Sequence, residues 1–166
     1  MTQQYSLEAV WSRLGIAWSV PPELTPLTVD VERAIVDAAD VFSYDSGHQS
    51  LFVAWLSRFG AAVDAQRVLK LAIENKLSKR AAAFLCGASR HAEELDGRAD
   101  WAILANALGK IHGLASSRVL NPDEYDLAIM MRGLDCKFAE FGLRFPNIDE
   151  GDRRKLRSSA GMSCDK

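Results

Sequence analysis

Apolar residues recur every three to four positions along most of this chain. From Asp30 onward, Val31, Ile35, Ala38 and Phe42 share one side of a helix with 3.6 residues per turn. Similar apolar faces follow the same spacing at residues 7–14, 51–59, 63–73, 81–95, 101–111 and 127–141. No comparable stretch of alternating Val, Ile and Thr indicates a strand. The pattern predicts an all-α fold, a single-domain bundle of about seven helices.

The first helix is bounded by clear start and stop signals. Ser6 is expected to cap its N-terminus, and Gly15 to end it in the left-handed conformation. Ile16 would then fold back onto Trp11, as is usual at a Schellman ending. The sequence VPPELTPLT follows, and its three prolines predict a rigid, non-helical connection. Further along, Ser43–His48 is expected to be a loop.

The last helix has the strongest start signal, in the sequence LNPDEY. Asn121 is expected at the N-cap and Pro122 at the first helical position, with acidic residues complementing the dipole behind them. The helix is predicted to run to Gly142, weakened or bent at Gly133. Leu143 should then contact Phe138. The buried face of this helix is expected to consist of Leu127, Met130, Met131, Leu134, Phe138 and Phe141.

Two short glycine turns indicate how the helices are arranged. The sequences GAAVD at Gly60 and GRAD at Gly97 each join a pair of predicted helices and lie about 37 residues apart. This spacing favours αα-hairpins stacked on one another. Residues 1–150 are expected to form the helical domain, and residues 151–166 a basic, disordered C-terminal tail.

Composition narrows the classes of function. Apolar residues make up 48% of the chain and charged residues 25%, as in soluble globular proteins. The formal charge of −2 gives no global attraction to nucleic acid or to an anionic membrane. The tail differs, because its five basic and two acidic side chains give it a formal charge of +3. The absence of a signal-peptide pattern, of a membrane-spanning run and of paired cysteines predicts a cytoplasmic protein.

Catalytic and metal-binding patterns are weak. The sequence GASRH resembles a nucleophile elbow but lies within a predicted helix, and Ser89 and His91 point to different sides of it. His48, His91 and His112 have no helical spacing to one another or to cysteine, so neither a metal site nor a cofactor is predicted. An enzyme would need a site assembled from distant helices, around His91 or His112.

A DNA-reading helix-turn-helix is also poorly supported. The segment from Gln49 to Ala72 has the required helix, turn and helix, but its second helix offers only Gln66, Arg67 and Lys70 to a base edge. A buried hairpin accounts for this segment better.

Three features remain that packing does not explain. Trp11 and Trp18 lie in a segment that prolines separate from the rest, where they either clamp it onto the bundle or anchor a partner. Phe145 lies beyond the last helix and is a further candidate partner contact. The third feature is a basic set that would dock on an acidic protein surface or contact phosphates: Arg144, Arg153, Arg154, Lys155 and Arg157.

We therefore expect a non-catalytic, all-α interaction or regulatory protein, of the kind found in bacterial regulation. It would bind another protein or a second copy of itself through an apolar helical face; the partner of a toxin or of an enzyme is one form of this. The first alternative is a nucleic-acid-associated regulator that uses the basic tail. The second is an enzyme of the distant-helix type. No partnership with a membrane is expected.

Overall fold

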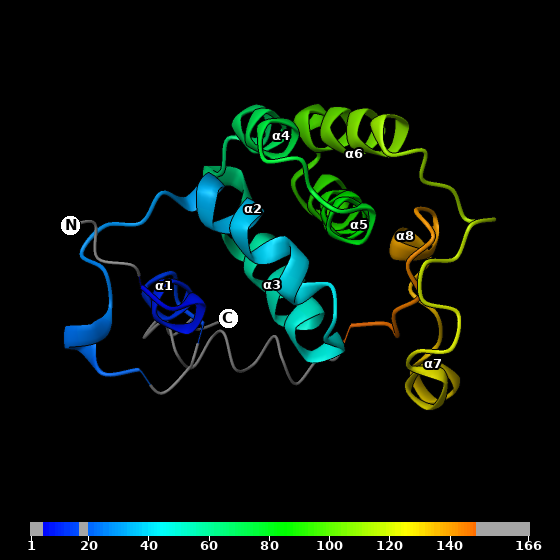
Figure 1. The fold of residues 1–166 in the computed structure, drawn as a ribbon, viewed down its shortest axis with the longest axis horizontal. Helices are drawn as coiled ribbons and strands as arrows, with labels where there is room; N and C mark the ends of the chain where they lie inside the picture. The colour runs from blue at the N-terminus through cyan, green and yellow to red at the C-terminus, as the bar shows by residue number, and fades with distance from the viewer. Residues whose placement is uncertain (1–4, 17–19, 149–166) are drawn as a thin grey trace.

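A computed structural model describes residues 5–16 and 20–148 of the 166-residue chain. In these residues eight α-helices form and no strand, so the predicted all-α fold is confirmed (Figure 1). Two short 3₁₀ turns, at Pro22–Leu24 and Gly60–Ala62, lie between them. The helices are α1 (Leu7–Arg13), α2 (Val31–Phe42), α3 (Ser46–Phe59), α4 (Ala65–Glu74), α5 (Lys79–Asp96), α6 (Ala99–Ile111), α7 (Asp126–Arg132) and α8 (Cys136–Ala139).

The predicted ends of α1 are confirmed. The Ser6 hydroxyl accepts a hydrogen bond from the Ala9 amide at 3.2 Å. Gly15 takes the left-handed conformation with φ +102°, and the Ile16 amide donates to the Trp11 carbonyl at 3.0 Å. This is the Schellman pattern, which satisfies carbonyls that the helix end leaves free.

The predicted loop at Ser43–His48 is shorter than expected. The Asp45 side chain accepts from the amides of Gly47 at 2.7 Å and His48 at 3.0 Å. An aspartate that caps in this way starts a helix at the next residue along the chain. Ser46–His48 therefore form the first turn of α3, and only residues 43–45 connect it to α2.

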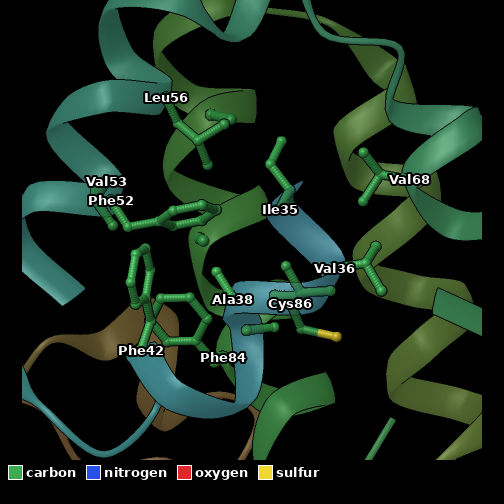
Figure 2. Close-up of a cluster of buried hydrophobic side chains, with 14 of the residues drawn as sticks. Ile35, Val36, Ala38, Phe42, Phe52, Val53, Leu56, Val68, Phe84 and Cys86 are labelled. Carbon is green, nitrogen blue, oxygen red and sulfur yellow. The ribbon is translucent and has the colours of Figure 1, made fainter. Parts of the chain in front are cut away.

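Helix α5 occupies the centre of the bundle. It packs against α2, α3, α6 and α8, and α4 bridges α2 and α6 (Figure 1). Small side chains on α5, including Ala81, Ala83 and Ala88, let these neighbours approach closely. Figure 2 shows Phe42, Phe52 and Phe84 meeting at the middle of the core. Because α2 contacts α4 and α5 more than its sequence neighbour α3, the arrangement as stacked hairpins is not confirmed.

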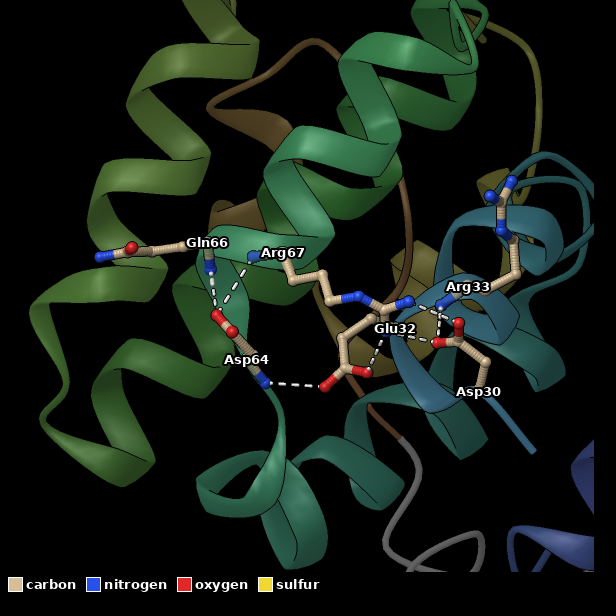
Figure 3. A network of polar contacts seen from close by, with 6 residues as sticks. All are labelled: Asp30, Glu32, Arg33, Asp64, Gln66 and Arg67. Carbon is tan, nitrogen blue, oxygen red and sulfur yellow. Dashed lines mark hydrogen bonds and ion pairs between the residues drawn. The ribbon is translucent and has the colours of Figure 1, made fainter. Parts of the chain in front are cut away.

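A polar network joins the N-terminal ends of α2 and α4 (Figure 3). The Arg67 guanidinium binds Asp30 at 2.5 Å and Glu32 at 2.9 Å. Glu32 also accepts from the Asp64 amide at 2.9 Å, and the Arg67 hydrogen bond holds the pKa of Asp30 below its ordinary value. Arg67, one of the few basic residues a DNA-reading helix would have offered here, is thus engaged within the fold.

None of the helices in the described part of the chain has the combined length and apolarity needed to cross a bilayer.

Candidate interaction surface

The predicted helix from Asn121 to Gly142 is wrong in its start. Asn121 is buried, and its side chain pairs with the backbone of Arg144 in both directions. Its amide donates to the Arg144 carbonyl at 2.8 Å, and its oxygen accepts from the Arg144 amide at 2.7 Å. Because that oxygen is occupied, it does not cap a helix. Helix α7 begins only at Asp126, after Tyr125 in the left-handed conformation with φ +62°.

The same predicted helix is also divided in two, because it ends at Gly133 instead of bending there. Asn147 occupies the last carbonyls of α7: its amide donates to the Gly133 oxygen at 2.9 Å and its side chain to the Arg132 oxygen at 2.8 Å. Gly133 has φ +83°, a conformation open to glycine at little cost. The chain then forms an isolated antiparallel bridge between Leu134 and Pro146 before α8 begins.

Helix α8 ends at Ala139, before the predicted end at Gly142, but the turn that follows it closes as predicted. Gly142 has φ +84°, and the Leu143 amide donates to the Phe138 carbonyl at 3.1 Å. A Cβ at Gly142 would lie 2.9 Å from the Ala115 carbonyl oxygen, so the turn needs glycine for space as well as for its φ. This close approach holds α8 against the connection that follows α6.

Helix α7 turns its apolar side away from the protein. Leu127 is 66% exposed, and Met130 and Met131 are each 77% exposed. Leu134, just beyond the helix, is 43% exposed. We call these four residues the α7 apolar face. Their expected place in the core is therefore wrong, since no residue of α7 is buried.

The inward side of α7 is less apolar than its outward side. Ala128, Ile129 and Arg132 are half-buried. Helix α7 makes no substantial packing contact with any other helix of the described residues. In Figure 1 it lies at the edge of the molecule, beyond α8. An amphipathic helix normally buries its apolar stripe against the core, whereas the apolar stripe of α7 faces outward.

The connection before α7 is fixed by three anchors. The Tyr125 hydroxyl donates to the Tyr44 carbonyl at 2.6 Å, and its ring lies 5.3 Å from that of Phe145. Arg80 binds Glu124 at 2.6 Å and holds the pKa of that carboxylate below its ordinary value. These contacts pin the N-terminal end of the segment and leave the apolar face uncovered.

Arg144 provides the third anchor. It binds Asp126, the first residue of α7, at 2.9 Å, and its guanidinium also donates to the Pro122 carbonyl. It was predicted to contact a partner's acidic groups or phosphates, but in the structure its charge is engaged within the chain. The other members of that basic set, Arg153, Arg154, Lys155 and Arg157, lie outside the described residues.

Two of the predicted partner contacts are core residues. Trp11 is 1% exposed and packs against Phe42 and Trp55, so it clamps the N-terminal segment onto the bundle. Phe145 is fully buried, with its ring 5.2 Å from that of Phe138. Neither can touch a partner without leaving the core. Of the two roles considered for Trp11, the structure shows the clamp. Trp18 falls outside the described residues.

The two histidines proposed for an enzyme site do not share a cleft. His91, in the second half of α5, has its Nε2 2.8 Å from a carboxylate oxygen of Asp135. Asp135 also accepts from the Lys137 and Phe138 amides and so caps α8. His112 follows α6 instead, near Lys79 at the start of α5, and partial burial and that lysine lower its pKa. The His91–Asp135 pair fastens α8 to α5, a structural use of both residues.

A groove of about 570 Å³ runs beside this pair, between α5, α6 and α8. Most of its charged side chains are paired with one another: Arg90 with Glu93 at 3.1 Å and Glu140 at 3.0 Å, and Lys137 with Glu94 at 2.5 Å. Arg98, which also lines it, donates to backbone carbonyls of residues 60–63. Neither His91 nor Asp135 lines it. Residues 5–16 and 20–148 contain no group of three His, Cys, Asp or Glu side chains placed to hold a metal ion.

Comparisons with protein-family models, with curated proteins and with solved structures give no match.

Proposed function

We propose that this chain is a non-catalytic interaction or regulatory protein that binds another protein through the α7 apolar face. The observation that carries the proposal is the outward orientation of Leu127, Met130 and Met131. Large contiguous apolar patches are rare on monomeric proteins and often mark binding sites. Because burying one Leu or Met side chain completely gives about 2 kcal/mol, covering this face offers roughly 5 kcal/mol before the costs of association.

The spacing of the face favours one mode of binding. Leu127, Met130 and Met131 stand at positions i, i+3 and i+4 of α7, the spacing with which an amphipathic helix enters an apolar groove. Leu134 lies beyond the helix end and extends the exposed apolar surface. Two methionines suit this role, since their flexible side chains adapt to the groove wall. The anchors at Tyr125 and Asp126 hold α7 in place beforehand and reduce the entropy lost on binding. The partner is accordingly a protein with an apolar groove, for example an enzyme or a toxin.

A nucleic-acid role has less support. Arg144 is engaged with Asp126, so phosphate contacts would fall to tail residues outside the described part of the chain. The described residues therefore give no support to nucleic-acid binding.

A site-specific cross-linking experiment tests the proposed function. A photoreactive amino acid replaces Met131 in one form of the full chain and Ile103, which is 52% exposed on α6, in the control form. After irradiation in cells we expect a specific protein adduct from position 131 and none from position 103. Sedimentation velocity of the purified chain then shows whether that partner is a second copy.

The added substitution Leu127→Asp should abolish the adduct, because a charge on the face opposes its burial. Equal labelling from positions 103 and 131, or no adduct from 131, would contradict the proposal.

A further inference from the structure

The two methionines of the α7 apolar face are adjacent, and each is 77% exposed. Of the described cysteines, Cys86 is buried and Cys136 is exposed. Among the described residues, the buried core contains no methionine. The remaining two, Met1 and Met162, lie outside the described residues.

From this placement we propose that Met130 and Met131 form a reversible oxidation site, at which hydroperoxides weaken docking by α7. This inference rests on the proposed function, because it assigns a form of regulation to the same face. The thioether sulfur attacks one oxygen of a hydroperoxide. The O–O bond breaks as the S–O bond forms, so the sulfur loses two electrons and hydrogen peroxide is reduced to water.

The product changes the character of the face. A sulfoxide is polar and accepts hydrogen bonds, so two of the four side chains that would enter an apolar groove become costly to bury. Methionine sulfoxide reductases return the thioether at the expense of a thiol reductant, which makes the change reversible. Leucine has similar apolarity and volume but lacks the sulfur. It therefore separates the apolar contribution of each position from its oxidation chemistry.

Oxidation at these positions should leave the fold intact. Neither side chain belongs to the core, and α7 contributes no buried residue to it. The anchors of the segment are Tyr125 on Tyr44, Arg80 on Glu124 and Arg144 on Asp126, and none of them involves a methionine. In many proteins methionine oxidation acts by disrupting the core; here its effect is confined to the outward face.

The test uses the purified full chain in three forms: wild type, the variant Met130→Leu with Met131→Leu, and the variant Met130→Gln with Met131→Gln. Each is treated with hydrogen peroxide, mapped by peptide mass spectrometry, and run on phenyl-substituted agarose, which serves as the apolar probe. We expect wild type to gain one oxygen at each methionine and to elute earlier, at the position of the glutamine variant. Reductase treatment should restore its original position, and the thermal midpoint should stay within about 2 °C.

The leucine variant is the matched control, since it keeps Met1 and Met162. Peroxide should leave its elution unchanged. An equal shift in wild type and the leucine variant overturns the proposal, as does oxidation of Met130 and Met131 without any shift. Resistance of these two methionines to peroxide overturns it as well. The cross-linking experiment at position 131 can fail while this one succeeds, so the two proposals are distinguishable.

Discussion

Helices α7 and α8 are separated by only three residues, yet they relate to the core in opposite ways. Helix α8 has four residues and buries Phe138 completely, with Phe141 buried directly behind it. Helix α7 has seven residues and buries none. The difference lies in the surfaces they meet. A Cβ at Gly87 on α5 would lie 2.7 Å from Cγ of Phe138, and one at Gly109 on α6 would lie 3.1 Å from Cε1 of Phe141.

The two glycines on α5 and α6 thus provide the space that the α8 rings fill, and within residues 5–16 and 20–148 no comparable contact receives the side chains of α7. A helical apolar stripe shows that a helix can be buried; the receiving surface decides whether it is.

The largest effect is expected from truncating the α8 anchor. Phe138→Ala should lower the free energy of unfolding by about 4 kcal/mol, because it removes a fully buried ring and leaves a cavity. The matched change on α7, Leu127→Ala, should alter it by less than about 0.5 kcal/mol. Urea denaturation followed by circular dichroism measures both. Similar losses in the two variants would mean that α7 is packed as firmly as α8.

A smaller loss is expected from filling the space on α5. Gly87→Ala should cost about 1 to 3 kcal/mol, since the new methyl group overlaps the Phe138 ring. Adding Phe138→Leu should recover part of that loss, because the smaller side chain leaves room for the methyl group. A Gly87→Ala protein as stable as wild type in the same urea titration would show that the ring is not confined by this glycine.

A third, small effect concerns the ion pair before α7 and depends on pH. The Arg80 guanidinium lowers the pKa of Glu124 in the folded protein, so the pair stabilises the fold above the ordinary glutamate pKa of about 4.3. That contribution is lost as the pH falls from about 4.3 toward the lower folded pKa.

Wild type and Glu124→Gln should therefore differ most at neutral pH and converge in acid. Because Glu124 is partly exposed, we expect a difference of less than about 1 kcal/mol. Unfolding free energies at pH 7 and pH 3 check this. A gap that widens in acid would contradict the assignment.

Sequence patterns were most reliable where a local interaction decides the structure. Ser6, Gly15 and Gly142 act on neighbours within five residues, and their predicted roles at the ends of α1 and α8 are confirmed. The predicted N-cap at Asn121 is wrong because the backbone of Arg144, 23 residues away, pairs with both the oxygen and the nitrogen of its side-chain amide. Gly133 ends a helix instead of bending it because Asn147 takes the last carbonyls.

The candidate surface was harder to predict for the same reason. Met130 and Met131 keep helical register with Phe138, and register alone does not tell an inward stripe from an outward one. The sequence feature that could have indicated an outward face is the pair of adjacent methionines followed closely by Gly133, which ends the helix. The proposed anchors Trp11 and Phe145 were drawn from residue type, and their burial depended on contacts with α2, α3 and α5 that spacing does not reveal.

The segment that carries α7 leaves and rejoins the bundle at the stretch 142–147. The Asn121 side chain pairs with the backbone of Arg144, and the backbones of Asp135 and Gly133 pair with those of Phe145 and Asn147. Between these points almost nothing on the outward side of α7 is needed by the core. The outward positions Leu127, Met130 and Met131 can therefore be substituted without cost to the core, for instance in an engineered scaffold. The segment itself stays fixed to the bundle through Glu124, Tyr125 and Asp126.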